Sequence, residues 1–212
     1  SPISNGRYIM AGWMPINGWG GPFLIHELIQ YPDGRIGTKW MKELIPATTD
    51  AVVLAKSVEQ KNSFPVKDGN FILTFDVVPQ KQKDGKLPLS FLPSDGSNIK
   101  GCEMQINITG FTAQYSDAVK DGFGGMQKSI RNGGNPGLAG NYAIENIMGV
   151  EKPFTVRILV KSNAKLGGTI IDTEVAGQNT LVTYRNGLHV ENILFNIEQT
   201  GIHNVKIMKI AE

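Results

Sequence analysis

Hydrophobic and polar residues alternate along most of the chain, with the period of two that is typical of β-strands with one buried face. Between residues 71 and 77 the odd positions are all hydrophobic, whereas Thr74 and Asp76 occupy even positions, and residues 154–161 show the same alternation. Patterns of this kind predict strands at residues 7–13, 23–30, 35–40, 71–77, 87–92, 102–108, 110–115, 154–161, 168–175, 180–184, 193–197 and 204–210.

Turn-forming pairs of residues separate these runs. Asp-Gly or Asn-Gly occurs at residues 33–34, 68–69, 84–85, 95–96 and 186–187, and such pairs supply the positive φ angles of tight hairpins. The hydrophobic positions of residues 204–210 change phase after Ile207, which indicates a bulge or a strand buried on both faces. We expect at most a turn or two of helix, near residues 50–60 or 118–130. A dozen short strands joined by such turns predict an all-β fold, an antiparallel β-sandwich of the jelly-roll or concanavalin-like type.

The chain divides into two units by composition. All three tryptophans, Trp13, Trp19 and Trp40, precede Pro46. We therefore expect a hairpin-rich segment at residues 1–46 and a β-sandwich at residues 47–212. Residues 116–141 contain seven glycines, and a loop of that length is either a surface excursion or the border of a ligand groove, where glycine lets the backbone approach closely.

Charge and composition exclude several classes of partner. Of the residues, 41% are hydrophobic and 19% are charged, which excludes intrinsic disorder. The 21 basic residues are balanced by 19 acidic ones, so we expect no nucleic-acid partner, and no apolar run is long enough to predict a membrane span. The chain begins with Ser1 and Pro2, without an initiator methionine or a signal peptide, and we expect its original N-terminus to have been removed.

The residues that usually carry metal or nucleophilic chemistry are scarce. The single cysteine, Cys102, cannot form an internal disulfide and falls on the hydrophobic side of its run, which predicts a core thiol. His26, His189 and His203 show no zinc spacing and no nucleophile elbow, and neither glycine cluster fits a phosphate loop. We therefore expect no cofactor and no metal, and we place the His26 side chain toward solvent or a neighbouring strand.

Asp172 and Glu174 form the best local pair of carboxylates. Two residues apart on a strand, they point to the same side, as the acid and base of a small glycosidase could. The same alternation turns Ile171, Thr173 and Val175 inward. A solvent-facing or salt-bridging role for the two carboxylates is the simpler interpretation.

Aromatic residues gather near the N-terminus and are interleaved with polar ones. Aromatic rings stack on the apolar faces of sugars, and they are also common in cores and interfaces. The sugar-binding candidates are Trp13, Trp19, His26, Glu27 and Trp40.

Three motifs in this segment resemble the closing strands of the catalytic propeller of glycoside hydrolase family 32, the fructan hydrolases and invertases. They are GRYIMAGWM at residues 6–14, GWGGPFLIHEL at 18–28 and DGRIGTKWMKEL at 33–44. The family pattern has Pro-Arg where this chain has Ile25 and His26. It has Gln-x-Pro-Val where this chain has Lys-Trp-Met-Lys, at residues 39–42. Residues 170–185 are loosely similar to the Asp-x-Ser-x-x-Glu segment of the family.

The resemblance implies a β-sandwich joined to the last propeller strands, and a secreted or periplasmic bacterial protein. The family's catalytic residues lie in Trp-Met-Asn-Asp-Pro, Arg-Asp-Pro and Glu-Cys segments, none of which occurs here. No catalytic residue is therefore carried over, and we expect the chain alone not to be an enzyme. Trp13 and Trp19 match tryptophans of the last blade, which could border a sugar pocket.

These observations favour one function and leave two alternatives. The first is a non-catalytic C-terminal β-sandwich module of a family-32-like glycosidase that acts on fructans or related carbohydrates, with a structural role and sugar contacts. The alternatives are a free-standing, lectin-like carbohydrate-binding module, which uses the tryptophans or the loop 116–141, and a small glycosidase that uses Asp172 and Glu174. The expected partners are a carbohydrate or the missing propeller domain, with self-association through residues 1–46.

Overall fold

The computed structural model describes residues 2–13, 22–79, 85–118, 143–165, 167–196 and 201–211. Within them, strands form one small sheet and two six-stranded sheets, and every strand pair is antiparallel. The small sheet consists of β1 (Tyr8–Trp13), β2 (Phe23–Gln30) and β3 (Ile36–Trp40), in that order. Two short 3-10 turns, Ser4–Gly6 and Lys42–Leu44, flank it.

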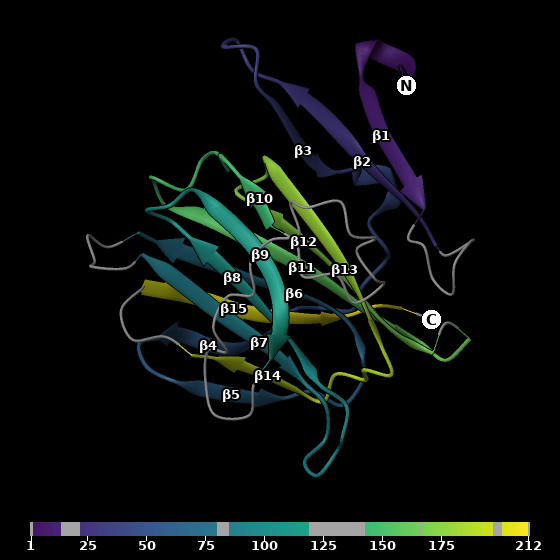
Figure 1. Cartoon of the computed structure of the whole chain (residues 1–212), viewed down its shortest axis with the longest axis vertical. Helices are drawn as coiled ribbons and strands as arrows, with labels where there is room; N and C mark the ends of the chain where they lie inside the picture. The colour runs from purple at the N-terminus through teal and green to yellow at the C-terminus, as the bar shows by residue number, and fades with distance from the viewer. Residues whose placement is uncertain are drawn as a thin grey trace.

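The two larger sheets pack face to face as a sandwich (Figure 1). In spatial order, the first contains β10 (Ala143–Glu145), β9 (Thr112–Ala118), β8 (Gly101–Asn107), β7 (Lys86–Leu92), β14 (Asn192–Phe195) and β5 (Asn62–Pro65). The second contains β13 (Asn179–Asn186), β12 (Gly168–Val175), β11 (Phe154–Asn163), β6 (Asn70–Val78), β15 (Gly201–Lys209) and β4 (Val52–Val58). The predicted all-β, antiparallel sandwich is confirmed.

The core lies between the two sheets, where the hydrophobic sides of the alternating strands meet. On β6 and β11 these sides are fully buried, and on β8 they include Cys102, whose exposed fraction is 0%. The predicted core position of the thiol is therefore confirmed. β12 departs from this alternation, because all of its residues are buried, on both faces, and β8 is likewise buried at all but its last position.

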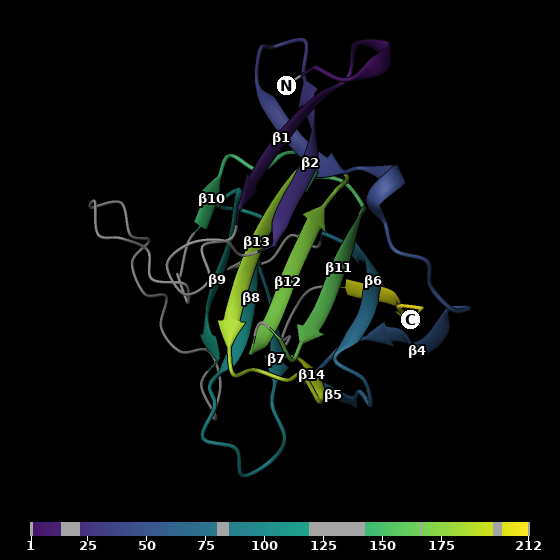
Figure 2. The same cartoon turned by 90° about the vertical axis from the view of Figure 1, so that its right-hand side faces the viewer.

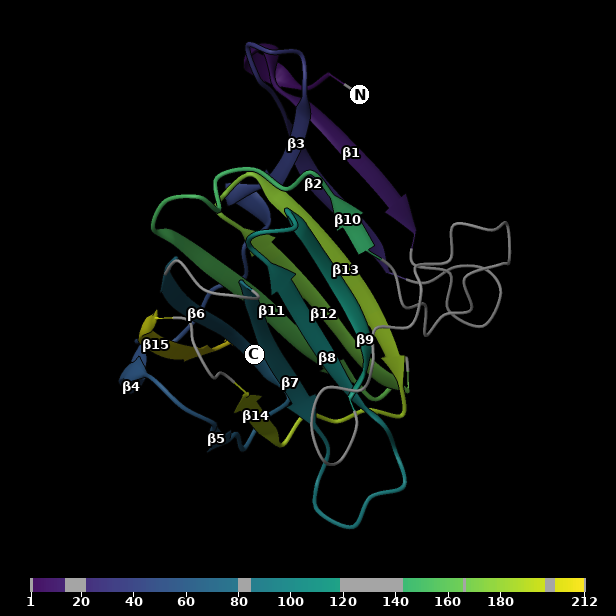
Figure 3. The same ribbon diagram turned by 60° about the vertical axis from the view of Figure 1, so that its left-hand side comes forward.

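The small sheet explains the double burial of β12. Figure 2 shows it over the outer face of the layer formed by β11, β12 and β13, at one end of the sandwich. The N-terminus lies at the far tip of the small sheet, away from the sandwich (Figures 1 and 3). The division of the chain at residue 46 into two domains stays a prediction.

Three details correct or confirm the predicted elements. The helical turn expected near residues 50–60 is wrong, because residues 52–58 form β4, which pairs with β15. The predicted bulge is confirmed by a register shift between Val205 and Lys206. Residues 119–130, where the other helical turn was expected, lie outside the described residues, as does most of the glycine-rich loop 116–141.

Glu103 on β8 is a buried carboxyl group on the outer side of its sheet. It is 3% exposed, and Ser90 and Ser116 are its neighbours on β7 and β9. Burial raises the pKa of Glu103 from 4.5 to about 7, because the charged form loses its hydration. The folded protein therefore binds this proton more tightly than the unfolded chain does.

This burial predicts that the free energy of unfolding falls as the pH rises from about 4.5 to about 7. Glu103→Gln removes the ionisation, so at pH 8 it should raise the free energy of unfolding by up to about 3 kcal/mol, at about 1.36 kcal/mol per pKa unit. Toward pH 4 the pH slopes of the two proteins should converge, because the unfolded carboxyl group also becomes protonated. Urea unfolding between pH 4 and 8 measures the difference, and a difference independent of pH would contradict the account.

Candidate functional site

The small sheet contacts the sandwich through side chains that point to the same side of β2 and β3. His26 on β2 is paired in register with Trp40 on β3, and Thr38 lies two residues before Trp40. Opposite them, the outward positions of β12 carry Asp172 and Glu174. The strand alternation that faces Ile171, Thr173 and Val175 into the core thus turns both carboxylates toward the small sheet.

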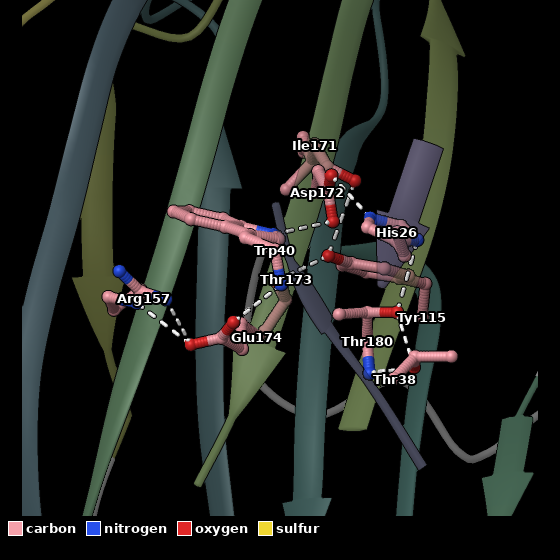
Figure 4. Close-up of polar contacts among 10 residues, drawn as sticks. All are labelled: His26, Thr38, Trp40, Tyr115, Arg157, Ile171, Asp172, Thr173, Glu174 and Thr180. Atoms are coloured by element: carbon pink, nitrogen blue, oxygen red, sulfur yellow. Dashed lines mark hydrogen bonds and ion pairs between the residues drawn. The ribbon is translucent and has the colours of Figure 1, made fainter. Parts of the chain in front are cut away.

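Both oxygens of Asp172 are engaged by the small sheet. The indole Nε1 of Trp40 donates to Oδ1 at 3.1 Å, and Nε2 of His26 lies 2.9 Å from Oδ2. On the other side of the imidazole, Nδ1 lies 3.2 Å from Oγ1 of Thr180 on β13. Figure 4 shows these contacts meeting around the two buried rings.

A chain of polar contacts connects His26 with two threonines. The Thr180 amide donates to Oγ1 of Thr38 at 2.9 Å, and the two threonine hydroxyls are 2.6 Å apart. Both ring nitrogens of His26 therefore have a polar partner, Asp172 at Nε2 and the Thr180 hydroxyl at Nδ1.

Both oxygens of Glu174 are also engaged. The Trp40 amide donates to Oε2 at 2.7 Å, while Nε and Nη2 of Arg157 donate to Oε1 at 2.8 and 2.5 Å. The Arg157 guanidinium lies 4.9 Å from the centre of the Trp40 ring, in a cation–π contact. Trp40 therefore uses its amide, its indole N–H and its ring face at once.

A backbone contact adds to these side-chain bonds. The Thr38 amide donates to the Gln178 carbonyl at 2.9 Å. A Cβ atom on Gly37 would lie 2.4 Å from the same carbonyl oxygen, so the close approach of β3 requires glycine.

Two predictions about this region are corrected. Asp172 and Glu174 do not face solvent, since they are 9% and 3% exposed, although the salt-bridging role is present in the pair of Glu174 with Arg157. His26 is 5% exposed, and it faces another sheet rather than solvent or a neighbouring strand. Strand alternation alone does not show what covers the outer side of a sheet.

Two other sugar-binding candidates, Glu27 and Trp13, lie elsewhere on the small sheet. Glu27 points to the opposite side, where it pairs with Arg7 at 2.6 Å and Lys39 at 3.2 Å, and the hydrogen bond from Arg7 lowers its pKa. Trp13 is 67% exposed, and its ring centre lies 5.8 Å from that of Phe23. Trp19 lies outside the described residues.

Three residues of the site, Arg157, Thr38 and Thr180, were not predicted. Arg157 is directly opposite Glu174 in the pairing of β11 with β12. A charged pair of opposite sign on two consecutive strands was the signal that could have identified it. The two threonines have no comparable signal, because their contact joins residues 142 positions apart.

The carboxylates do not face a common cleft. Asp172 and Trp40 line a pocket of about 280 Å³, whereas Glu174 and Arg157 line a different one of about 670 Å³. A glycosidase needs both carboxyl groups across one bond, and here each of the four oxygens already accepts a hydrogen bond. The arrangement is that of a docking contact between two sheets.

No group of three or more His, Cys, Asp or Glu side chains in the described part of the chain could hold a metal ion. The helices found among these residues are too short to cross a membrane.

Comparisons with known proteins find relatives by structure and not by sequence. No protein-family model matches the sequence. No curated protein matches it either. The exo-inulinase of Aspergillus awamori matches 99% of this chain with a TM-score of 0.59 and 10% identity, over 41% of its own length. The fructofuranosidase of Schwanniomyces occidentalis in complex with fructose matches 99% of this chain with a TM-score of 0.62 and 10% identity, over 46% of its length.

The chain has the fold of part of a family 32 glycoside hydrolase. The family-32-like fold, predicted from three short motifs, is thereby confirmed, and the chain spans less than half the length of the family 32 enzymes it matches. The family-32-like pattern is interrupted at His26, and Trp40 occupies the variable position of the Gln-x-Pro-Val segment. These are the positions from which the small sheet contacts Asp172 and Glu174.

The close approach at Gly37 predicts a strong effect of a single methyl group. Gly37→Ala should lower the free energy of unfolding by about 1–3 kcal/mol, because the new Cβ collides with the Gln178 carbonyl. Gly12→Ala, in the same sheet with nothing within 4 Å of its Cβ, is the matched control, and it should change stability by less than about 0.5 kcal/mol. Urea unfolding followed by tryptophan fluorescence measures both, and equal effects would refute the proposed contact.

Proposed function

We propose that this chain is the non-catalytic β-sandwich module, with the last propeller strands, of a family-32-like glycosidase that acts on fructans or related carbohydrates. The match of 99% of this chain to 41–46% of the family 32 enzymes supports this proposal. The resemblance of residues 6–44 to the closing propeller strands supports the assignment of the small sheet to the last blade.

The observation that carries the proposal is the exposed apolar surface of the small sheet. Trp13 and Phe23 are 67% and 54% exposed, and Tyr8, Met10 and Ile36 are also exposed. By register, Trp13 and Phe23 lie on the side of the sheet that carries Glu27, and the other three lie on the side of His26 and Trp40. Large apolar side chains exposed on both sides of one small element mark surfaces that another domain covers. Propeller blades usually contain four strands, and the small sheet has three in the described part of the chain. The domain that fits against these exposed side chains is the rest of the propeller.

In this role the module works by packing. The buried contacts of Trp40 hold the terminal blade against the sandwich, so the sandwich stabilises the blade next to the catalytic domain. The carboxylates that could have supplied chemistry are used for docking instead. The sugar chemistry then belongs to the domain that carries the family's catalytic segments.

The proposal predicts that the purified chain does not hydrolyse sucrose, inulin or levan, and that the coding sequence preceding Ser1 encodes a Trp-Met-Asn-Asp-Pro segment. An activity assay on the three sugars and sequencing of the gene test the two parts. Reproducible turnover by this chain, abolished when Asp172 and Glu174 are both replaced by alanine, would instead support a small glycosidase. An upstream sequence without the catalytic segments would overturn the proposed parentage.

A free-standing carbohydrate-binding module is the second candidate, because the exposed pair of Trp13 and Phe23 offers a platform on which a sugar could stack. As an interdomain surface, the same pair would bind no sugar and would promote self-association of the isolated chain.

Replacing both rings, Trp13→Ser with Phe23→Ser, separates these roles. We expect the unmodified chain to self-associate at high concentration and the double variant to be monomeric by light scattering. Val52→Ser with Val53→Ser, which removes two equally exposed side chains from β4, is the control and should leave self-association unchanged. A monomeric unmodified chain that binds fructans through Trp13 would contradict the interdomain role and favour the carbohydrate-binding module.

A further inference from the structure

A pocket of about 670 Å³ lies beside the docking contact. Its walls are the loop 149–153, the start of β11 and the turn 176–178 between β12 and β13, and its floor contains Arg157 and Glu174. Figure 3 shows this loop and this turn at the end of the sandwich where the small sheet stands. Its volume is within the range of about 300–1,000 Å³ that is typical of small-molecule sites. The role proposed above does not use it.

The charges in the pocket balance. Glu151 and Lys152 extend from the loop, and Glu174 and Arg157 form an ion pair on the floor. Glu174 is 3% exposed, whereas the Arg157 side chain is 35% exposed and uses only Nε and Nη2 on Glu174. Because a guanidinium has five N–H groups, donors on Nη1 remain for a ligand. The pocket thus offers donors and acceptors without net charge.

The wall is rigid and places backbone next to the pocket. Gly149, Ala176 and Gly177 all have positive φ angles, of 78°, 56° and 62°. Alanine rarely adopts this conformation, and at functional sites such strain is held by the surrounding structure. Here the Ala176 amide donates to the Thr155 carbonyl at 3.0 Å, which ties the turn to β11. The turn is therefore held beside the pocket by its own backbone conformation and by this hydrogen bond.

We propose that this pocket binds a short neutral oligosaccharide. Sugars carry many hydroxyl groups that both donate and accept hydrogen bonds, which matches the mixed floor of Arg157 and Glu174. An anion would gain little, because each cation is balanced by a carboxylate, and an apolar ligand would leave the ion pair desolvated. The proposal is independent of the parentage of the chain, since it rests on this pocket alone.

Isothermal titration calorimetry on the whole chain tests the proposal, with 1-kestose, nystose, maltotriose and cellotriose as probes and citrate as the anion. At least one of the sugars should give saturable heat, and citrate should give none. Glu151→Ala with Lys152→Ala should raise the Kd at least about tenfold. Glu59→Ala with Lys165→Ala, which removes the same two charges from exposed positions away from the pocket, should change it less than about twofold.

Three results would overturn the proposal: no saturable heat with any of the four sugars, binding of citrate alone, or sugar binding that is unchanged by the Glu151 and Lys152 substitutions. Loss of sugar binding in Trp13→Ser with no effect of the pocket substitutions would place the site on the exposed aromatic pair instead. Glu151 and Lys152 make none of the hydrogen bonds of the docking contact, and Glu151 acts on Arg35 of the small sheet through its charge, so urea unfolding should show that both double variants unfold close to the midpoint of the unmodified chain. If the coding sequence preceding Ser1 lacks the catalytic segments of the family, the proposed relation to a family-32-like glycosidase is overturned. The proposal that this pocket binds an oligosaccharide is unaffected by that result.

Discussion

The burial of two carboxylates on β12 is the constraint on which the structure depends. A buried carboxylate is strongly destabilising unless its oxygens are hydrogen-bonded. The small sheet both buries Asp172 and Glu174 and supplies partners for them, because Trp40 donates to both of them and His26 contacts Asp172, while Arg157 of the sandwich completes Glu174. A small sheet that covered β12 in another position would leave these charges buried without those partners, which fixes where it lies.

This constraint connects the fold with its proposed role. The side of the small sheet that carries Trp40 and His26 is occupied by the sandwich, and Trp13 and Phe23 remain exposed. A sheet held on one side, with Trp13 and Phe23 exposed beside the ion pairs of Glu27 on the other, is suited to joining two domains. The carboxylate pair that suggested catalysis is used for this contact, since Asp172 and Glu174 face separate pockets. The polar groups that still face an open pocket lie next to the contact, around Arg157.

The sequence predicted the sandwich because strand alternation and turn residues are local signals. The alternation of β6, β8 and β11 identified their core sides, and the change of phase in β15 identified its bulge. The covering of β12 could not be predicted this way, because it depends on a segment 132 positions earlier, as the Trp40–Asp172 bond shows. The motifs that revealed the family-32-like fold depart from the family pattern at His26, and Trp40 occupies its variable position. The pattern therefore did not identify either residue as part of the contact.

Hydrogen exchange of the Thr38 and Trp40 amides tests the central claim most directly. Both amides point away from β2, toward the Gln178 carbonyl and the Glu174 carboxylate, so a detached small sheet would leave them open to water. The docked arrangement predicts that both exchange on the order of a thousandfold more slowly than in an unstructured chain, which corresponds to an opening free energy of about 4 kcal/mol. Exchange of these two amides at the unprotected rate, while the amides of β11 and β12 stay protected, would contradict it.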